Sequence, residues 1–240
     1  MLPKAGKDRK VITNYRPISL LPTLGKLMER ILNSRIMRHL IHEGYFNNIQ
    51  RGFIPKKNAS EILYKLTEEI VATKDANKQV CNKPWATSVF SLDVEKAFDS
   101  AWHNAIRFKL HTAVLPPKIL RILSSFLTKR TLRVRSASEV SNAVEVKAET
   151  TQRNVIRPLL YLVYVNDVPI ESSGLRGGQY ADDLNGWESY RNAKRGGAKL
   201  QRGLTDTENW ARKWRIKLNA DKTQLTTFSQ RKITKSYGLK

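Results

Sequence analysis

The sequence has little cysteine and no long apolar run. Its only cysteine in 240 residues is Cys81, which excludes a disulfide framework or a cysteine-rich zinc site within this chain. No stretch approaches the ~18 apolar residues that a membrane-spanning helix requires, and the N-terminal MLPKAGKDRKV lacks the apolar core of a signal peptide. The sequence therefore predicts an intracellular protein with no membrane partner.

The chain is also poor in acidic residues. It has 21 Asp plus Glu against 43 Lys plus Arg, which gives a formal net charge of +22. The basic residues are spread along the chain, and this favours a basic face on a folded domain over a disordered basic tail. Because a polyanion would relieve the self-repulsion, the charge predicts a nucleic-acid-binding protein. A soluble but adhesive protein is the alternative that charge alone leaves open.

The sequence shows neither an internal repeat nor a low-complexity linker, and its apolar pattern alternates between helix and strand periods. The segment 158–168 fits a buried helix or a strand by periodicity, and Pro158 in a first helical turn favours the helix. The mixture predicts a small α/β sheet covered by helices. We expect helices at 24–43, 59–73, 95–113, 119–127, 158–168 and 193–214, strands at 85–94, 131–138 and 224–229, and a hairpin over 174–187.

Two adjacent aspartates, Asp182 and Asp183, lie within GQYADDLNGW (178–187), between two apolar stretches. One interpretation is a hairpin turn, because Asp tolerates turn geometry and Asn185-Gly186 follows closely. The other is a metal site. The predicted strand FSLD delivers Asp93 at its end, so three carboxylates would converge at one sheet edge if the two strands are neighbours.

Three converging carboxylates repel one another unless a divalent cation lies between them. Mg²⁺ is a hard cation that combines a few carboxylates with substrate phosphates. Two such ions, about 3.5–4 Å apart, stabilise both the attacking and the leaving oxygen of an in-line phosphoryl transfer. A basic face together with an acidic cluster therefore suggests nucleotidyl transfer.

At these motifs the sequence resembles the reverse transcriptases, and within them the non-LTR retrotransposon branch of jockey-like elements. Group II intron and telomerase-type polymerases share the acidic motifs, and NYRPISLL favours the retrotransposon branch. The resemblance rests on five ordered blocks: NYRPISLLPTLGKLMERIL (14–32), FSLDVEKAFDSAWH (90–103), PLLYLVYVNDVP (158–169), QYADD (179–183) and WARKWRIKLNADKTQLTTF (210–228).

The resemblance implies a right-hand polymerase fold of α/β (α+β) class, with helical fingers and a ferredoxin-like palm that has an antiparallel sheet. Residues 1–84 would form a fingers-type region and 85–240 the palm, with a finger-like insertion around 115–150. It implies an RNA template, a DNA primer, deoxynucleoside triphosphates (dNTPs) and two Mg²⁺ ions, with Mn²⁺ as an alternative. The primer 3′-OH would attack the α-phosphate. The resemblance also implies access to the nucleus, which no feature of the residues themselves indicates.

Carried over residue by residue, the resemblance assigns catalysis and metal binding to Asp93, Asp182 and Asp183. Phe98 matches the bulky residue that blocks a ribose 2′-OH; its alternative is a core Phe at helical spacing from Trp102. Lys222 matches a lysine that neutralises or protonates pyrophosphate; its alternative is a solvated lysine. Gln152 matches a glutamine near the nascent base pair.

The resemblance and the residues themselves also give expectations for Tyr180 and Asp99. Tyr180 is expected beside the primer terminus or, alternatively, in the core of its strand. Asp99 is expected to be an acid on a helix surface or a structural acid, and not a metal ligand.

Two segments depart from the family pattern. In ETTQRNVIRP (149–158), Glu149 and Arg153 stand where the family has glycines, which let a backbone pass close to a ligand. In QRGFIPKKNAS (50–60), Ile54 stands where the family commonly has an arginine, and Lys56 and Lys57 partly replace its charge. We therefore expect a degenerate nucleotide pocket.

The sequence also ends soon after the last predicted strand, so we expect a fragment with fingers and palm and without a thumb. Two hypotheses follow. The chain is either an RNA-directed DNA polymerase or an inactive polymerase-fold remnant that only binds nucleic acid.

Overall fold

The structure is a computed structural model, and it describes residues 2–3, 6, 8, 10–11, 14–16, 22–79, 85–136, 139–145 and 154–229. The chain divides into two compact units. The first comprises residues 1–46 and 98–164, and the second comprises residues 47–97 and 165–240.

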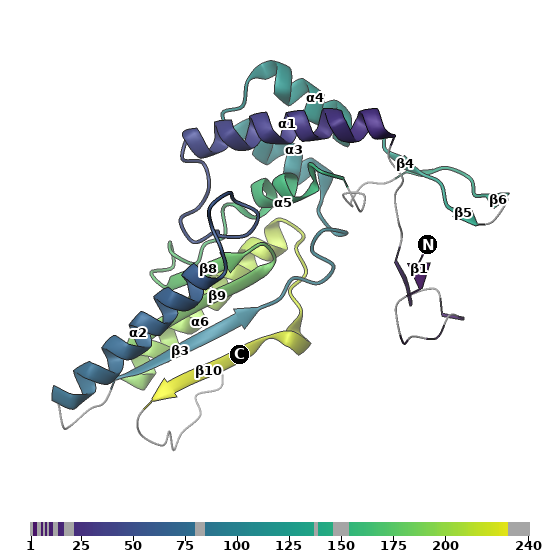
Figure 1. Cartoon of the computed structure of the whole chain (residues 1–240). Helices are drawn as coiled ribbons and strands as arrows, with labels where there is room; N and C mark the ends of the chain where they lie inside the picture. The colour runs from purple at the N-terminus through teal and green to yellow at the C-terminus, as the bar shows by residue number, and fades with distance from the viewer. Residues whose placement is uncertain are drawn as a thin grey trace. The chain divides into compact units, whose positions relative to one another are not determined.

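A four-stranded sheet forms the centre of the second unit (Figure 1). Its strands are β3 (Ala86–Leu92), β8 (Arg176–Tyr180), β9 (Asp183–Tyr190) and β10 (Gln224–Ser229). The order across the sheet is β10-β3-β9-β8, and every neighbouring pair is antiparallel. The expected strands at 85–94 and 224–229 and the expected hairpin are confirmed.

Helices cover both faces of this sheet. Successive side chains along each strand point to opposite faces, so each face contributes its own set of side chains to the packing. On one face, α2 (Ser60–Gln79) packs Ile62 against Val89 and Trp187. There Thr87 Oγ1 also shares hydrogen bonds with Thr73 of α2 and with Ser189 of β9. Six of the seven residues of β3 are buried, although Thr87, Ser88 and Ser91 interrupt its apolar pattern.

The opposite face is covered by α6 (Ala193–Lys213). Tyr190 lies on this face, where its hydroxyl shares a hydrogen bond of 2.7 Å with Ser88 Oγ. Lys199 Nζ of α6 lies 2.8 Å from Glu188 Oε2 of β9. A short 3-10 helix, η2 (Ala220–Lys222), follows α6 and leads into the edge strand β10.

The first unit is mainly helical. It contains α1 (Thr23–His42), α3 (His103–Thr112), α4 (Pro117–Leu127) and α5 (Arg157–Val165), of which α5 crosses into the second unit at its last residue. Three two-stranded pairs accompany them: β1 (Leu2–Pro3) with β2 (Tyr15–Arg16), β4 (Thr131–Leu132) with β7 (Val144–Glu145), and β5 (Arg135–Ser136) with β6 (Glu139–Val140).

The segment whose periodicity was ambiguous is the helix α5, and every residue from Leu159 to Val165 is buried. Lys109, buried on α3, donates from Nζ to the carbonyl of Tyr164. Glu29, buried on α1, accepts a hydrogen bond of 2.7 Å from the backbone N–H of Val155. These buried charged groups hold backbone atoms, which compensates part of their desolvation.

The helix expected at 95–113 was wrong in its first part, because α3 begins only at His103. The backbone from Glu95 to Asp99 forms turns, with Lys96 in the left-handed region (φ 48°). The Glu95 N–H donates to the Lys217 carbonyl at 2.8 Å and Val94 forms a bridge with Leu218. A tertiary pairing therefore uses the backbone groups that a helix would need.

Other boundaries differ by smaller amounts. The helix expected at 59–73 extends to Gln79, and the one expected at 119–127 begins at Pro117, which fits the first helical turn. The strand expected at 131–138 was wrong: it is two separate two-residue strands, and residues 137–138 lie outside the described ranges. Among the described residues, no helix combines the length and apolarity needed to cross a bilayer.

Two adjacent glycines of α6 provide a test of this packing. A Cβ at Gly196 would lie 2.2 Å from Cγ of Tyr190, whereas a Cβ at Gly197 would meet nothing within 4 Å. We expect Gly196→Ala to lower the free energy of unfolding by about 1–3 kcal/mol through overpacking. Gly197→Ala should raise it by up to about 1 kcal/mol through helix propensity. Urea unfolding of both variants measures this, and shifts of the same sign would contradict the packing.

Candidate functional site

The acidic pair lies at a tight hairpin between β8 and β9. Tyr180 pairs with Asp183, so Ala181 and Asp182 form a two-residue turn. Ala181 has φ 57°, the left-handed conformation that such hairpin turns require at one of their central positions. Asn185 and Gly186, the expected turn signal, lie inside β9. The aspartates are therefore part of a turn, as one of the two interpretations predicted.

The register of the sheet places Asp93 at the same edge. Leu92, the last residue of β3, pairs with Leu184, so Asp93 and Asp183 are the next positions along the two antiparallel strands. A one-residue slip would invert the side-chain directions, and the pairing through all seven residues of β3 fixes this register. The sheet thus brings Asp93 to the acidic hairpin.

Asp93 is held by the segment that follows α6. Its backbone carbonyl accepts from the Asn219 N–H at 2.8 Å. Its Oδ2 accepts from Asn219 Nδ2 at 3.3 Å and from Lys222 Nζ at 3.0 Å. The Lys222 side chain remains 65% exposed, so this ion pair adds little stability by itself but places an ammonium group beside the carboxylates.

The hairpin carboxylates are electrostatically strained. Partial burial raises the pKa of Asp182, the negative charge of Asp93 raises it further, and its own backbone N–H and the charge of Lys222 oppose the shift. The pKa of Asp183 is also raised, first by desolvation and then by the charges of Asp182 and Asp93, again against Lys222. The charge of Asp93 therefore acts on both hairpin carboxylates, and a nearby cation would relieve the repulsion.

The donor chemistry of this edge fits a hard cation such as Mg²⁺, because all three side chains offer carboxylate oxygens. Within the described ranges, however, no group of three or more His, Cys, Asp and Glu side chains is arranged so that it could hold a metal ion. Asp93 Oδ2 instead contacts Lys222 and Asn219. Coordination by all three carboxylates would therefore require their side chains to rearrange.

The other predicted residues fall at several places. Phe98 belongs to the first unit, outside any helix, with its ring centroid 4.6 Å from that of Tyr161 and the Arg157 guanidinium 5.0 Å from its own centroid. The expected helical spacing from Trp102 was therefore wrong. Asp99 lies in a turn and not on a helix surface, and it accepts from Arg157 at 2.6 Å, which fits the structural alternative.

Tyr180 is 38% exposed and is therefore not a core tyrosine. Ile54 is buried, whereas Lys56 and Lys57, which we expected from the sequence to replace part of an arginine's charge, are exposed. Gln152 lies outside the described residues, as do Glu149 and Arg153.

Three polar residues of this region were missed in the sequence. Asn219 binds Asp93 through both backbone and side chain. Gln50 and Gln179 are buried and contact the backbone of the acidic turn. A glutamine at an inward position of a predicted strand was the available signal for Gln179, and Gln50 and Asn219 lie in loops without such a signal.

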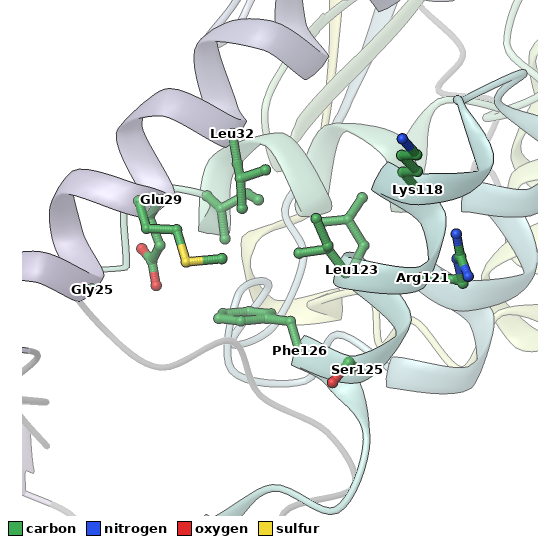
Figure 2. A pocket seen from close by; sticks show the side chains of 11 residues that line it. Gly25, Glu29, Leu32, Lys118, Arg121, Leu123, Ser125 and Phe126 are labelled. Atoms are coloured by element: carbon green, nitrogen blue, oxygen red, sulfur yellow. The ribbon is translucent and has the colours of Figure 1, made fainter.

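A hollow of about 820 Å³ lies between α1 and α4 in the first unit. Figure 2 shows Leu32 and Glu29 of α1 on one side and Leu123 and Phe126 of α4 on the other. Its lining is mainly apolar and contains none of the predicted site residues. The hollow therefore shares no lining residue with the acidic edge.

The sequence from residue 2 to residue 238 matches the family model described as reverse transcriptase (RNA-dependent DNA polymerase). The RNA-directed DNA polymerase from mobile element jockey of Drosophila melanogaster is 29% identical over 96% of this chain and 25% of that protein. The probable RNA-directed DNA polymerase from transposon X-element of the same species is 32% identical over 98% of this chain and 25% of that protein. The chain thus spans about a quarter of the length of these curated relatives.

Solved telomerase structures share the fold. Candida tropicalis telomerase in complex with a fragment of telomeric RNA gives a TM-score of 0.58 at 11% identity, over 85% of this chain and 34% of that one. Apo telomerase from the same species, truncated from its C-terminal domain, gives 0.55 at 12% identity, over 85% and 41%. At these identities the likeness concerns the fold alone, which is a mixed α/β fold with an antiparallel four-stranded sheet.

The raised pKa values predict how Asp182 affects stability. A carboxyl whose pKa is higher in the folded state binds more protons there, so its contribution to stability falls as the pH rises through that window. We expect Asp182→Asn to raise the free energy of unfolding at pH 7, and the gain to disappear as the pH falls towards the ordinary aspartate value of 3.8.

Urea unfolding at pH 7 and near pH 4 measures the effect. Asp221→Asn, at an exposed aspartate of η2, is the matched control and should change stability little at either pH. A loss of stability in Asp182→Asn at pH 7 would show that the carboxylate is stabilised and not strained.

Proposed function

This chain belongs to the reverse transcriptase (RNA-dependent DNA polymerase) family, and from that premise we propose that it carries the polymerase site of a retrotransposon reverse transcriptase. The proposed reaction adds a dNTP to the 3′-OH of a primer on an RNA template. One observation carries the proposal: the β3–β9 register brings Asp93 beside the hairpin of Asp182 and Asp183.

We propose a right-hand arrangement with a fingers-type region at 1–84 and a palm at 85–240, including a finger-like insertion around 115–150. The strand order supports a ferredoxin-like palm. Counted along the sequence, β3 is the first strand of the sheet, β8 the second, β9 the third and β10 the fourth. Across the sheet they lie in the order fourth, first, third, second. The helix α6 connects the third strand to the fourth. The helix α2 lies within the proposed fingers-type region by sequence but packs on the sheet of the proposed palm. The two compact units of the chain therefore do not coincide with the two proposed regions.

Asp93, Asp182 and Asp183 would hold two divalent ions, Mg²⁺ or Mn²⁺, which supply charge stabilisation for the attacking and leaving oxygens. Lys222 would leave Asp93 Oδ2 and offer its ammonium group to the departing pyrophosphate. Its exposure and its long stem suit such a movement. Tyr180, exposed at the end of β8, would contact the primer terminus.

Phe98 would exclude a ribose 2′-OH, and its ring is supported for this by Tyr161 and Arg157. We assign Gln152 to the nascent base pair from the family pattern alone. The template would be held through distributed phosphate contacts, for which α1 offers the exposed Arg30, Arg35 and Arg38.

The alternative is a polymerase-fold remnant that binds nucleic acid without polymerising. Two features favour it: the Lys222–Asp93 ion pair occupies a carboxylate oxygen, and Glu149 and Arg153 stand in place of family glycines. The charge of +22 would serve either function.

Single-nucleotide primer extension on an RNA template with Mg²⁺ tests the proposal. We expect incorporation by the unaltered chain and a loss of at least about 100-fold in Asp182→Asn and in Asp183→Asn, since charge stabilisation at the reacting phosphate is usually a large part of catalysis. Asp221→Asn, at an exposed aspartate, is the control and should retain incorporation.

No incorporation by the unaltered chain would favour the remnant. The triple variant Glu149→Gly, Arg153→Gly, Asn154→Ser then tests whether that segment is the defect. Restored incorporation that is again lost with Asp182→Asn would assign the defect to the segment. A change in RNA affinity alone would make the segment a template contact.

Nucleic-acid affinity should depend steeply on salt. Phosphate contacts release counterions, so log Kd against log salt should have a slope of about 0.7 per contact for single strands and about 0.9 for duplex DNA. We expect tight, sequence-tolerant binding at low ionic strength, measured by fluorescence anisotropy with unrelated RNA sequences. Salt-insensitive binding would contradict both the polymerase and the remnant.

A further inference from the structure

The acidic turn is built on an unfavourable backbone conformation. Ala181 has a Cβ and yet adopts φ 57°, in a region that residues other than Gly, Asn and Asp rarely occupy. Such strained positions persist only where surrounding contacts determine them. Asp182 and Asp183 follow directly, so the direction of both carboxylates depends on what holds Ala181.

Two buried glutamines hold it. Gln50 Oε1 accepts from the Ala181 N–H at 3.2 Å, and Gln179 Nε2 donates to the Ala181 carbonyl at 3.0 Å. Gln50 is 1% exposed and Gln179 is fully buried. Side-chain amides thus bind both backbone polar groups of the strained residue, away from water that would compete for them.

The segment that carries Gln50 is fixed against the edge strand β8. The Gln179 N–H donates to the Ile49 carbonyl at 2.9 Å, and the Arg51 N–H donates to the Gln179 carbonyl at 2.8 Å. Arg51, itself buried, forms an ion pair with Glu61 of α2 at 2.7 Å. Gln50 is therefore presented to the turn by a short parallel pairing that α2 supports.

Gly52 closes the arrangement. Its N–H donates to the same Gln50 Oε1 at 2.7 Å. A Cβ at this position would lie 2.4 Å from the Ala181 nitrogen, so only glycine lets the two backbones approach this closely. Gln50 Oε1 therefore accepts from the backbone N–H groups of both Gly52 and Ala181, and it connects the segment of Gln50 to the acidic turn.

We propose that Gln50 is a positioning residue for the acidic turn: together with Gln179 it holds Ala181 in its strained conformation and so aims the carboxylates of Asp182 and Asp183. The aiming of catalytic carboxylates rests on the proposed function, whereas the clamp on the turn does not. Gln50 Nε2 has no hydrogen-bond partner among the described residues, so the acceptor oxygen carries the role.

Gln50→Met tests this, because it keeps the length of the side chain and removes the acceptor. We expect amide hydrogen exchange at Gly52 and Ala181 to accelerate at least about tenfold, while the amides of Val89 and Trp187 in the sheet centre keep their protection. Gln224→Met, at an exposed position of β10, is the matched control. Unchanged exchange at Gly52 and Ala181 would overturn the clamp.

Mn²⁺ affinity and single-nucleotide kinetics test the aiming of the carboxylates. In Gln50→Met we expect Mn²⁺ to bind about 10–100-fold more weakly, as is usual when a residue that orients metal ligands is removed. We also expect kcat to fall by a similar factor with little change in KM for the dNTP. Faster exchange with unchanged Mn²⁺ affinity and kcat would reduce Gln50 to a structural role and overturn the positioning.

The unaltered protein and Asp183→Asn separate this inference from the proposed function. If Mn²⁺ binding does not depend on Asp183, the metal site fails, and the exchange data still decide the clamp. Gln179→Met removes one hydrogen bond and leaves the Gln50 acceptor in place. Gln179→Met is the milder variant and serves if Gln50→Met unfolds the second unit. Faster amide exchange at Ala181 in Gln179→Met would then support the clamp, and unchanged exchange would overturn it.

Discussion

The pairing of β3 with β9 is the constraint on which the candidate site depends. Leu92 opposite Leu184 makes Asp93 and Asp183 the next positions on adjacent strands. The period of a strand is two, so a slip by one residue would exchange the faces that meet α2 and α6. Both faces are buried, which means that the register is determined by packing along the whole strand and the carboxylates inherit their placement from it.

This placement is electrostatically unfavourable by itself. Burial and mutual repulsion raise the pKa of Asp182 and of Asp183, in a chain whose charge is otherwise strongly positive. Lys222 opposes the shift and pairs with Asp93, so the chain supplies one cation of its own. The proposed polymerase site would make use of this repulsion, because carboxylates that were fully neutralised within the protein would have little affinity left for divalent ions.

The spacing of apolar residues and the turn residues predicted the strands of the four-stranded sheet, the buried helix α5 and the acidic hairpin. They failed where tertiary contacts use backbone groups, as in the turns from Glu95 to Asp99, where the Glu95 N–H binds Lys217. The acidic residues were visible because charge is rare between apolar stretches. Gln50 and Asn219 were not visible, since a loop amide gives no sign of which distant backbone group it binds.

The surroundings of the acidic edge differ in how firmly they are held. The turn of Asp182 is fixed by buried amides and by the doubly covered strand β9. Lys222 instead precedes β10, an edge strand whose residues are mostly exposed. Local opening is easiest where few groups are buried. A ligand that takes Asp93 Oδ2 therefore competes with a lysine on the less firmly held segment, whereas the backbone of the hairpin that carries Asp182 and Asp183 is the part that resists movement.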